Sequence, residues 1–234
     1  MTKLLFCQLL ILLSLRASGQ TDVCKPTLHY MAASRQPSAA ERSLLPKHAI
    51  VRASIAFSET EKLLVYETGK DEPKAEFKIV SGEKQLLLVA LSKMPGLARD
   101  PIFAGGLRPT WFARLCQASG KSMIVVASGS GATGEGQVFL VFLEAHGRYR
   151  HFQLPIAIKG RVELSAIEPQ TFKLWTIVDS EAIGVALPHY EISTYKLDES
   201  GFHRLHTNRT KRGYDPEQFV NHPIVLENGS DKTQ

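Results

Sequence analysis

Residues 122–143 read SMIVVASGSGATGEGQVFLVFL, and this stretch decides the fold. Two apolar runs, Met123–Ala127 and Val138–Leu143, flank a glycine-rich segment at 128–136. Short apolar runs that are rich in β-branched and aromatic residues predict strands covered on both faces. The stretch therefore predicts two central strands of a sheet that are joined by a hairpin loop.

The sequence on either side continues with strand patterns. Apolar and charged residues alternate in Lys74–Ile79 and Arg161–Leu164, which is typical of half-buried antiparallel strands. Further strands are expected at Leu86–Leu91, covered on both faces, and at Phe172–Val178 and Tyr190–Leu197. A strand from Ala49 onward would place four apolar residues on one face: Val51, Ala53, Ile55 and Phe57.

The predicted fold class is all-β. We expect a mostly antiparallel meander, arranged as a sandwich or as partial propeller-like sheets, with a short N-terminal helix. Ser38 and Glu41 have the spacing of a capping box, which predicts that helix over Ala39–Leu45. The expected organisation is an N-terminal arm at 20–48, a single β domain at 49–227 and a disordered tail at 228–234.

Residues 1–19 have the three parts of a secretory signal peptide. Lys3 supplies the positive charge, Leu4–Leu15 is mainly apolar, and Ala17 and Gly19 are the small residues before a cut at Gln20. The apolar run is shorter than a membrane span, although a retained N-terminal anchor is the alternative reading. The sequence predicts export to the periplasm or the extracellular space.

Two cysteines remain after removal of this leader, Cys24 and Cys116. In an exported chain they are expected to form one disulfide, and two buried thiols are the alternative. The bridge would close a loop of about 90 residues and contribute roughly 4–5 kcal/mol in the chain-entropy model.

The charge of the chain is mildly positive. Loss of Lys3 and Arg16 with the leader lowers the formal net charge from +5 to +3. This value is too small to indicate a nucleic-acid partner. No later apolar run reaches the length of a membrane span.

Known catalytic, cofactor and metal motifs are not found in the sequence. Segment 128–136 lacks the lysine of a phosphate-binding loop, and no G-x-S-x-G nucleophile motif occurs. His203 and His206 form an H-x-x-H pair, whose members point to opposite faces in a regular strand. Three acids, Glu168, Asp179 and Glu181, are conceivable glycosidase carboxylates, but surface acids are the simpler interpretation. We therefore predict no catalytic residue, cofactor or metal ligand.

The densest basic stretch is 203–212, and a smaller one contains Arg148, Arg150 and His151. Basic side chains beside aromatic residues can bind an anionic glycan, a phospholipid or an acidic protein. The competing interpretation is an edge strand protected by charge against aggregation. The candidate ligand contacts are Arg204, Arg209, Lys211 and Arg212. Asn208 and Asn228 begin glycosylation sequons.

The pattern L-[DE]-x-x-G occurs at 143–147 and again at 197–201. Each copy follows an apolar run and leads into an aromatic residue, Tyr149 or Phe202. Two repeated units of three or four strands would produce this spacing, and so would chance similarity between two hairpins.

The sequence predicts a non-catalytic binding protein of the cell envelope or extracellular space. Its expected partner is another protein of that compartment or an anionic glycan. One alternative is a hydrolase whose site is assembled from loops 93–110 and 128–136, because catalytic groups need only spatial proximity. The other alternative is a peripheral binder of anionic surfaces through residues 203–212.

Overall fold

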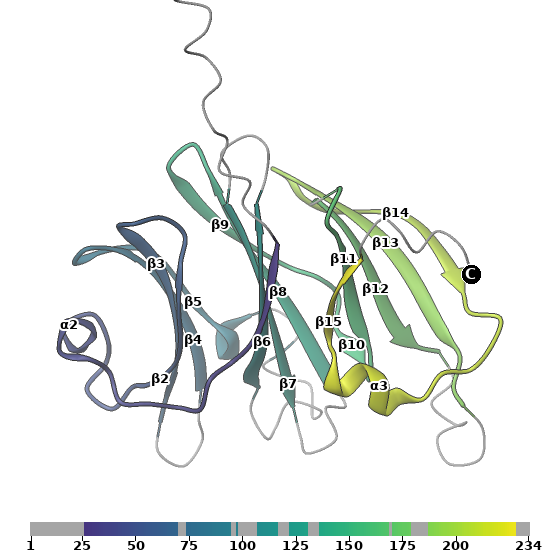
Figure 1. The fold of residues 1–234 in the computed structure, drawn as a ribbon, viewed down its shortest axis with the longest axis horizontal. Helices are drawn as coiled ribbons and strands as arrows, with labels where there is room; N and C mark the ends of the chain where they lie inside the picture. Colours follow the sequence, from purple (N-terminus) through teal and green to yellow (C-terminus); the bar gives the residue numbers. More distant parts are fainter. Residues whose placement is uncertain are drawn as a thin grey trace, which may run out of the picture.

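The computed structural model describes residues 26–69, 74–94, 97, 107–116, 122–130, 136–168, 170–178 and 187–227. These residues form three sheets that stack face to face in three layers (Figure 1). The prediction of an all-β, mostly antiparallel fold is confirmed. The predicted leader, Cys24 and the tail at 228–234 lie outside the described residues.

The first sheet is a four-stranded antiparallel meander in the order β2-β3-β4-β5. Its strands are β2 (Ile50–Ala56), β3 (Glu61–Thr68), β4 (Lys74–Ser81) and β5 (Lys84–Ala90). The 3-10 turn η1 (Leu91–Lys93) follows β5.

The middle sheet contains the stretch that decides the fold. Its strands run in the order β1-β6-β7-β8, and β8 then pairs with both β9 and β10. The bounds are β1 (Thr27–Tyr30), β6 (Arg108–Cys116), β7 (Ser122–Ser130), β8 (Gly136–Ala145), β9 (Arg148–Gln153) and β10 (Ala157–Ile158). The segment that we expected to be an N-terminal arm thus contributes β1, which pairs antiparallel with β6.

The last sheet is a second long meander with one parallel addition. Strands β11 (Arg161–Ser165), β12 (Thr171–Ile177), β13 (Tyr190–Asp198) and β14 (Gly201–Arg209) are antiparallel neighbours. After the short helix α3 (Pro216–Asn221), the chain returns as β15 (Ile224–Glu227) and pairs parallel with β11.

The core lies in two layers, one on each face of the middle sheet. Ile124 and Phe142 face the first sheet, and Val125 and Phe139 face the last sheet. All four are fully buried, which explains why β7 and β8 have apolar residues at consecutive positions. Burial of each such side chain stabilises the fold by about 1.5–3 kcal/mol. The sequence prediction for these two strands is confirmed.

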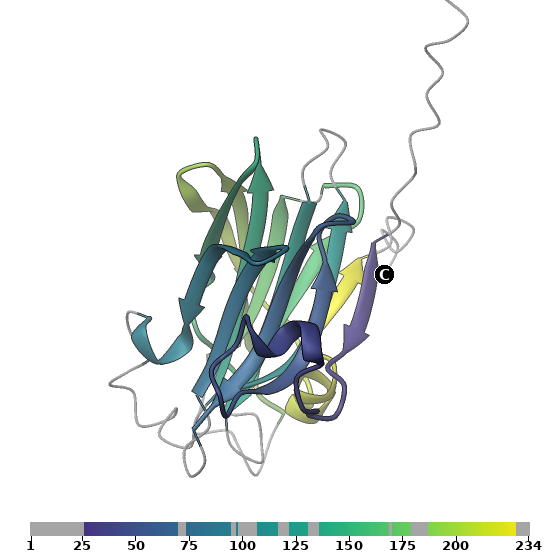
Figure 2. The ribbon, with the colours of Figure 1, turned by 90° about the vertical axis from the view of Figure 1, so that its left-hand side faces the viewer.

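The N-terminal segment covers the outer face of the first sheet, as the face-on view in Figure 2 shows. Leu45 and Ala49 pack there against Leu64 and Tyr66. The single helical turn α2 (Ala39–Arg42) lies in this segment and ends at Arg42, whereas the capping box predicted a helix that continues to Leu45.

Two strand predictions are wrong. Val51 does not share a face with Ile55 and Phe57, because a register shift between Val51 and Ala53 turns Val51 to the outer face of the first sheet. The run Leu86–Leu91 is not a central strand. It forms most of β5, the edge strand of the first sheet, and the Leu88 side chain is 47% exposed.

The two L-[DE]-x-x-G segments occupy equivalent places in the fold. Leu143–Gly147 contains the turn between β8 and β9, and Leu197–Gly201 contains the turn between β13 and β14. Each turn therefore joins the third and fourth strands of a four-stranded meander. In the described part of the chain, no helix is long and apolar enough to cross a membrane.

Candidate functional site

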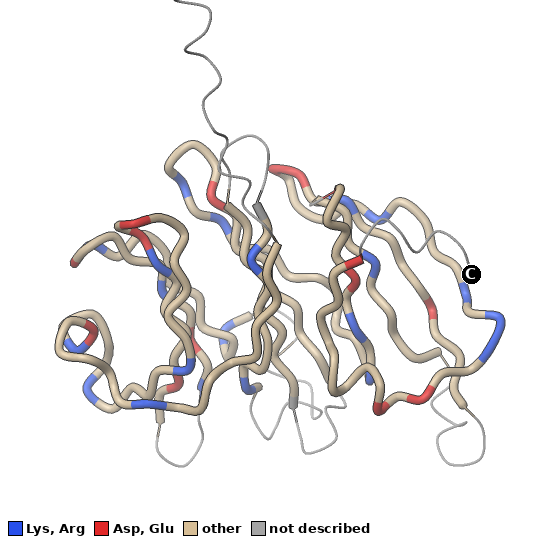
Figure 3. Tube along the Cα trace, viewed as in Figure 1, with Lys and Arg blue, Asp and Glu red and all other residues tan. Residues whose placement is uncertain are grey.

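The fourth strands of the three meanders lie along one flank of the stack. β9 contacts both β5 and β14, so the three edge strands are neighbours. The Phe152 ring of β9 lies 6.4 Å from the Phe202 ring of β14, measured between centroids. The basic stretch of β9 therefore lies beside the beginning of β14, whereas Arg209 ends β14 and Lys211 and Arg212 follow it at the opposite end of that strand. Figure 3 shows Lys and Arg positions along both strands.

We name this region the basic flank, and it is made of Arg148, Arg150, Arg204, Arg209, Lys211 and Arg212. Register places Arg204 opposite Tyr195 and Arg209 opposite Glu191 on β13. Tyr195 packs into the core against the middle sheet, so Arg204 and Arg209 lie on the face of β14 that turns toward that sheet. Lys211 and Arg212 follow the strand, and the Arg212 guanidinium lies 5.1 Å from the Tyr214 ring centroid. All four predicted contact residues are exposed.

The histidine pair of this stretch differs from its prediction. A register shift between Thr194 and Tyr195 pairs His203 with Lys196 and His206 with Thr194. Lys196 and Thr194 are two residues apart on β13, so both histidines lie on the same face of β14. The His206 Nε2 atom is 3.0 Å from the Thr194 hydroxyl. In the described ranges, no three potential metal ligands come together.

A hydroxyl, a histidine and a carboxylate meet at the turn between β13 and β14. The Ser200 Oγ atom is 2.7 Å from His203 Nε2 and donates to Asp198 Oδ1 at 2.6 Å. Asp198 Oδ1 also lies 3.1 Å from the same His203 nitrogen. A hydrolytic triad requires the acid and the nucleophile on different ring nitrogens. This exposed network lacks that arrangement and instead fixes the turn, and the Ser200 hydrogen bonds lower the pKa of Asp198 to about 2.

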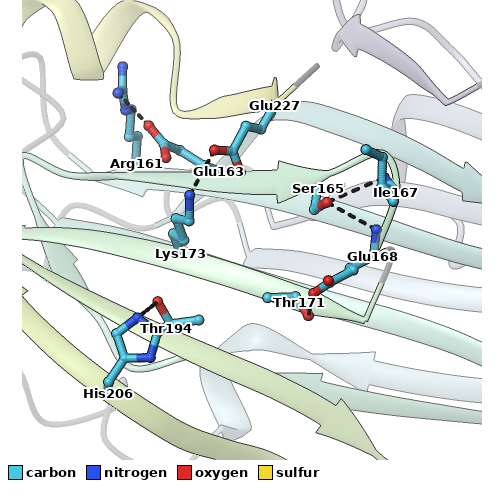
Figure 4. Close-up of polar contacts among 10 residues, drawn as sticks. All are labelled: Arg161, Glu163, Ser165, Ile167, Glu168, Thr171, Lys173, Thr194, His206 and Glu227. Atoms are coloured by element: carbon cyan, nitrogen blue, oxygen red, sulfur yellow. Dashed lines mark hydrogen bonds and ion pairs between the residues drawn. The ribbon is translucent and has the colours of Figure 1, made fainter. Parts of the chain in front are cut away.

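The outer face of the last sheet is polar, and its side chains are paired with one another (Figure 4). Ion pairs join Arg161 to Glu163 at 2.5 Å and Lys173 to Glu227 at 2.7 Å. Glu168 belongs to the β11–β12 turn, where it accepts a hydrogen bond from the Thr171 hydroxyl at 3.2 Å. Its suggested carboxylate partners, Asp179 and Glu181, lie outside the described residues.

Aromatic residues fill the end of this face that is nearest α3. The Arg161 guanidinium packs on both Trp175 and Phe219, at 4.7 and 4.6 Å from their ring centroids, and the two rings lie 5.6 Å apart. Tyr190 and Tyr214 complete the cluster. Because Phe219 of α3 contacts both the Trp175 ring and Arg161, the cluster attaches α3 to the sheet.

A hollow of about 330 Å³ lies between the β8–β9 and β13–β14 turns. Its lining consists of Leu143, Ala145, His146, Arg148, Arg150 and Glu199. The Arg150 Nη1 atom donates a hydrogen bond to the Glu199 carbonyl oxygen at 2.8 Å, which links the two turns. This hollow brings three basic side chains and one carboxylate to one place.

A second, shallower hollow of about 580 Å³ continues along β9 toward Phe202. Its lining is mostly apolar and includes Met94, Phe152 and Tyr195. His151 also lines it, and burial lowers the pKa of that imidazole. Sequence reasoning did not find either hollow, because each is formed by residues from separate parts of the chain.

The loops of the predicted hydrolase alternative fall mainly outside the described residues. Residues 95–96, 98–106 and 131–135 are not described, so most of the residues of that predicted hydrolase site lie outside the described part of the chain. The described ends differ from the prediction in one respect, since β6 begins at Arg108, inside the expected loop 93–110. Cys116 is the last residue of β6, and its predicted partner Cys24 is not described.

Comparison with known proteins does not place the chain in a family. No protein-family model matches it, and no curated protein is significantly similar to it.

Proposed function

We propose that this chain is an exported, non-catalytic binding protein whose basic flank holds an anionic glycan. The observation that carries the proposal is the convergence of the two basic stretches on neighbouring edge strands. Arg148, Arg204 and Lys211 form no ion pair with any described residue, so their charges are available to a partner. Cations without an ion-pair partner, next to partly buried aromatic rings, favour a sulfated or carboxylated sugar chain.

The shape of the flank favours a polymer over a flat surface. The charges follow two strands, and one shallow hollow beside the strands is lined by Phe152, Tyr195 and Phe202. A glycan can lie along such a row and place sugar rings against the aromatic residues. Arginine is also suited to carboxylate and sulfate groups, because its planar fork donates two parallel hydrogen bonds.

The test uses the mature chain and dextran sulfate, with neutral dextran as the uncharged comparison. We expect binding to dextran sulfate only, and we expect affinity to fall steeply as salt rises from 50 to 300 mM because surface charges are screened beyond about 10 Å. The double variant Arg204→Gln/Lys211→Gln should bind about tenfold more weakly, from roughly 0.5–1 kcal/mol for each lost contact. A matched variant, Lys47→Gln/Lys74→Gln, removes two exposed lysines elsewhere and should bind like the parent.

Four results would overturn this proposal. Equal binding of both double variants would remove the flank from the interaction. Binding that is insensitive to salt would exclude a charge-based mechanism. Turnover in a panel of hydrolase substrates, combined with no polymer binding, would favour the enzyme alternative. Vesicles of phosphatidylglycerol serve as a further arm, and binding to them with no binding to dextran sulfate would favour a membrane surface instead.

The proposed compartment has its own test. Protein recovered from an exporting host should begin at Gln20, and its intact mass should show this directly. Under denaturing conditions without reductant, it should have no thiol that reacts with Ellman's reagent, because Cys24 and Cys116 are expected to be bridged. An intact N-terminus with two reactive thiols would contradict both expectations.

We further propose that the three meanders are successive units of a partial propeller-like stack. Each contributes four antiparallel strands in the same order, and the two L-[DE]-x-x-G turns join equivalent strands. An experimental structure in which the three meanders superpose strand on strand would support this relation. Meanders of different twist and strand order would favour an ordinary layered sandwich.

A further inference from the structure

We propose that the hollow between the β8–β9 and β13–β14 turns is an anchoring site for one sulfate or phosphate ester group. This inference rests on the proposed function, because it identifies where the glycan of the basic flank would be held most specifically. The ligand chemistry is a tetrahedral oxyanion attached to a sugar.

The geometry of the β8–β9 hairpin directs two arginines to the same place. Arg148 pairs with Ala145 and Arg150 pairs with Leu143 across the two strands. Residues two positions apart on a strand lie on one face, about 7 Å from each other. The side chains of Leu143 and Ala145 form an apolar wall beside them. The two arginine side chains therefore border one hollow.

The turn itself holds the third basic group. His146 and Gly147 both have positive φ angles, of 54° and 71°, and Glu144 accepts a hydrogen bond from the Gly147 N–H at 2.8 Å. Two consecutive residues in this conformation form the tight hairpin turn that joins antiparallel strands. The backbone is thus fixed at the mouth of the hollow, and His146 is one of the residues that line it.

Arg148 and Arg150 have N–H groups that can donate hydrogen bonds to a sulfate or phosphate group. Arg150 uses one N–H to bind the Glu199 carbonyl oxygen, which orients its guanidinium and leaves other N–H groups for a ligand. Arg148 forms no ion pair with a described residue. Two arginines can bind the oxygens of a sulfate or phosphate in bidentate fashion. The volume of about 330 Å³ is at the lower end of the range for small-ligand sites and accommodates a sugar-borne group.

The charged groups around the hollow favour an anion. Arg148 and Arg150 approach from β9, Glu199 belongs to the β13–β14 turn, and Glu144 lies on β8, where its carboxylate accepts a hydrogen bond from the Gly147 N–H. Two guanidinium groups and one glutamate therefore line the hollow, and a sulfate or phosphate ester has the charge that this set of side chains favours.

The test measures binding of glucose 6-sulfate to the mature chain, because this ester presents one sulfate group on a single sugar. Glucose is the neutral comparison and glucose 6-phosphate is the second oxyanion. Titration calorimetry at pH 7.5 in sulfate-free and phosphate-free buffer should show binding of the sulfate ester and no binding of glucose. The imidazole resonance of His146 should shift on addition of ligand, because His146 lines the hollow.

Three variants separate the contributions. Arg148→Gln should weaken sulfate binding at least tenfold. His146→Asn, in which asparagine tolerates the positive φ angle, should weaken binding less than Arg148→Gln does, because it leaves both guanidinium groups in place. Glu199→Gln should bind more tightly than the parent, because it removes the one carboxylate that lines the hollow. Lys47→Gln is the control and should not change the affinity.

The outcomes separate this inference from the function on which it rests. If dextran sulfate binds the flank but neither ester binds, or the esters bind Arg148→Gln as well as the parent, the anchoring site is refuted while the proposed function stands. Binding of the phosphate ester alone, weakened by Arg148→Gln, supports the site and assigns it to phosphorylated sugars. Failure of both the polymer and the esters to bind refutes the two proposals together.

Discussion

The ion pair between Arg35 and Glu41 should make the attachment of the N-terminal segment sensitive to acid. The Arg35 guanidinium donates two hydrogen bonds to the Glu41 carboxylate, at 2.7 and 2.9 Å, and the Ser38 N–H donates a third at 2.9 Å. Glu41 is 3% exposed. Chiefly because of the Arg35 hydrogen bonds, its pKa falls from 4.5 to about 2. We therefore expect Glu41→Gln to destabilise the protein at neutral pH.

The magnitude follows from this lowered pKa. The difference between 4.5 and about 2 corresponds to about 3 kcal/mol of preference for the ionised carboxylate in the folded state. The Arg35 side chain is 47% exposed, so solvent screens part of the interaction. We expect Glu41→Gln to lose about 1–2 kcal/mol of unfolding free energy at pH 7. Because the folded pKa is lowered, this contribution is complete above about pH 4.5 and disappears as pH falls through about 2.

The assay is urea unfolding at pH 7, 4.5, 3 and 2, followed by tryptophan fluorescence. The difference between the parent and Glu41→Gln should be largest at pH 7 and should close between pH 4.5 and 2. Glu83→Gln is the matched control, since Glu83 is exposed in the β4–β5 turn, and it should behave like the parent throughout. A difference below 0.5 kcal/mol at pH 7, or one that persists unchanged at pH 2, would refute the reasoning.

Three further predictions concern the packing of the layers. Tyr149→Phe removes the hydrogen bond from the Tyr149 hydroxyl to Glu61, which joins the middle and first sheets, and should lower the unfolding free energy by about 1.5–3 kcal/mol in urea titration. Phe142→Ala should cost about 3–5 kcal/mol by the same measurement, and a loss below 1 kcal/mol would contradict its position in the core. Gly160→Ala should prevent folding or sharply lower the midpoint temperature of thermal unfolding, because a Cβ atom there would lie 1.9 Å from the Trp175 carbonyl oxygen. Gly82→Ala is the comparison: its Cβ atom would meet no atom within 4 Å, and its positive φ angle should lower the unfolding free energy by only about 1 kcal/mol.

The class of the fold could be predicted from the sequence because burial on two faces leaves a direct pattern. Val138–Leu143 is apolar at every position, and the structure buries it between two other sheets. The similar run Leu86–Leu91 also predicts a central strand, but most of it lies in β5, at an edge of the first sheet. The Leu88 side chain in that run is 47% exposed, so an apolar run does not by itself show that a strand is covered on both faces. The place of a strand in a sheet depends on which other strands pair with it.

The candidate site could be predicted only in part, for two physical reasons. The basic stretches were visible in the sequence, but their meeting depends on the order in which three meanders stack. The second reason is that two strands contain register shifts. One extra residue in a strand turns every side chain beyond it to the opposite face of the sheet. That effect moved Val51 to the outer face of its sheet and placed His203 and His206 on one face of β14. Local alternation does not reveal such an insertion.

The arrangement of the layers is the reason that we place ligand binding at the edge strands. In the part of the chain that the structure describes, the middle sheet is buried on both faces and the N-terminal segment covers the first sheet. The outer face of the last sheet is polar, and much of its charge is already paired. Basic edge strands also resist pairing with a second copy, which accounts for charge along β14. Protection of an edge does not require Arg148 and Arg150 to border the same hollow, or Arg150 to be oriented by the Glu199 carbonyl oxygen. Those two features are expected of a binding site, so variants at the hollow, rather than along β14, distinguish recognition from protection.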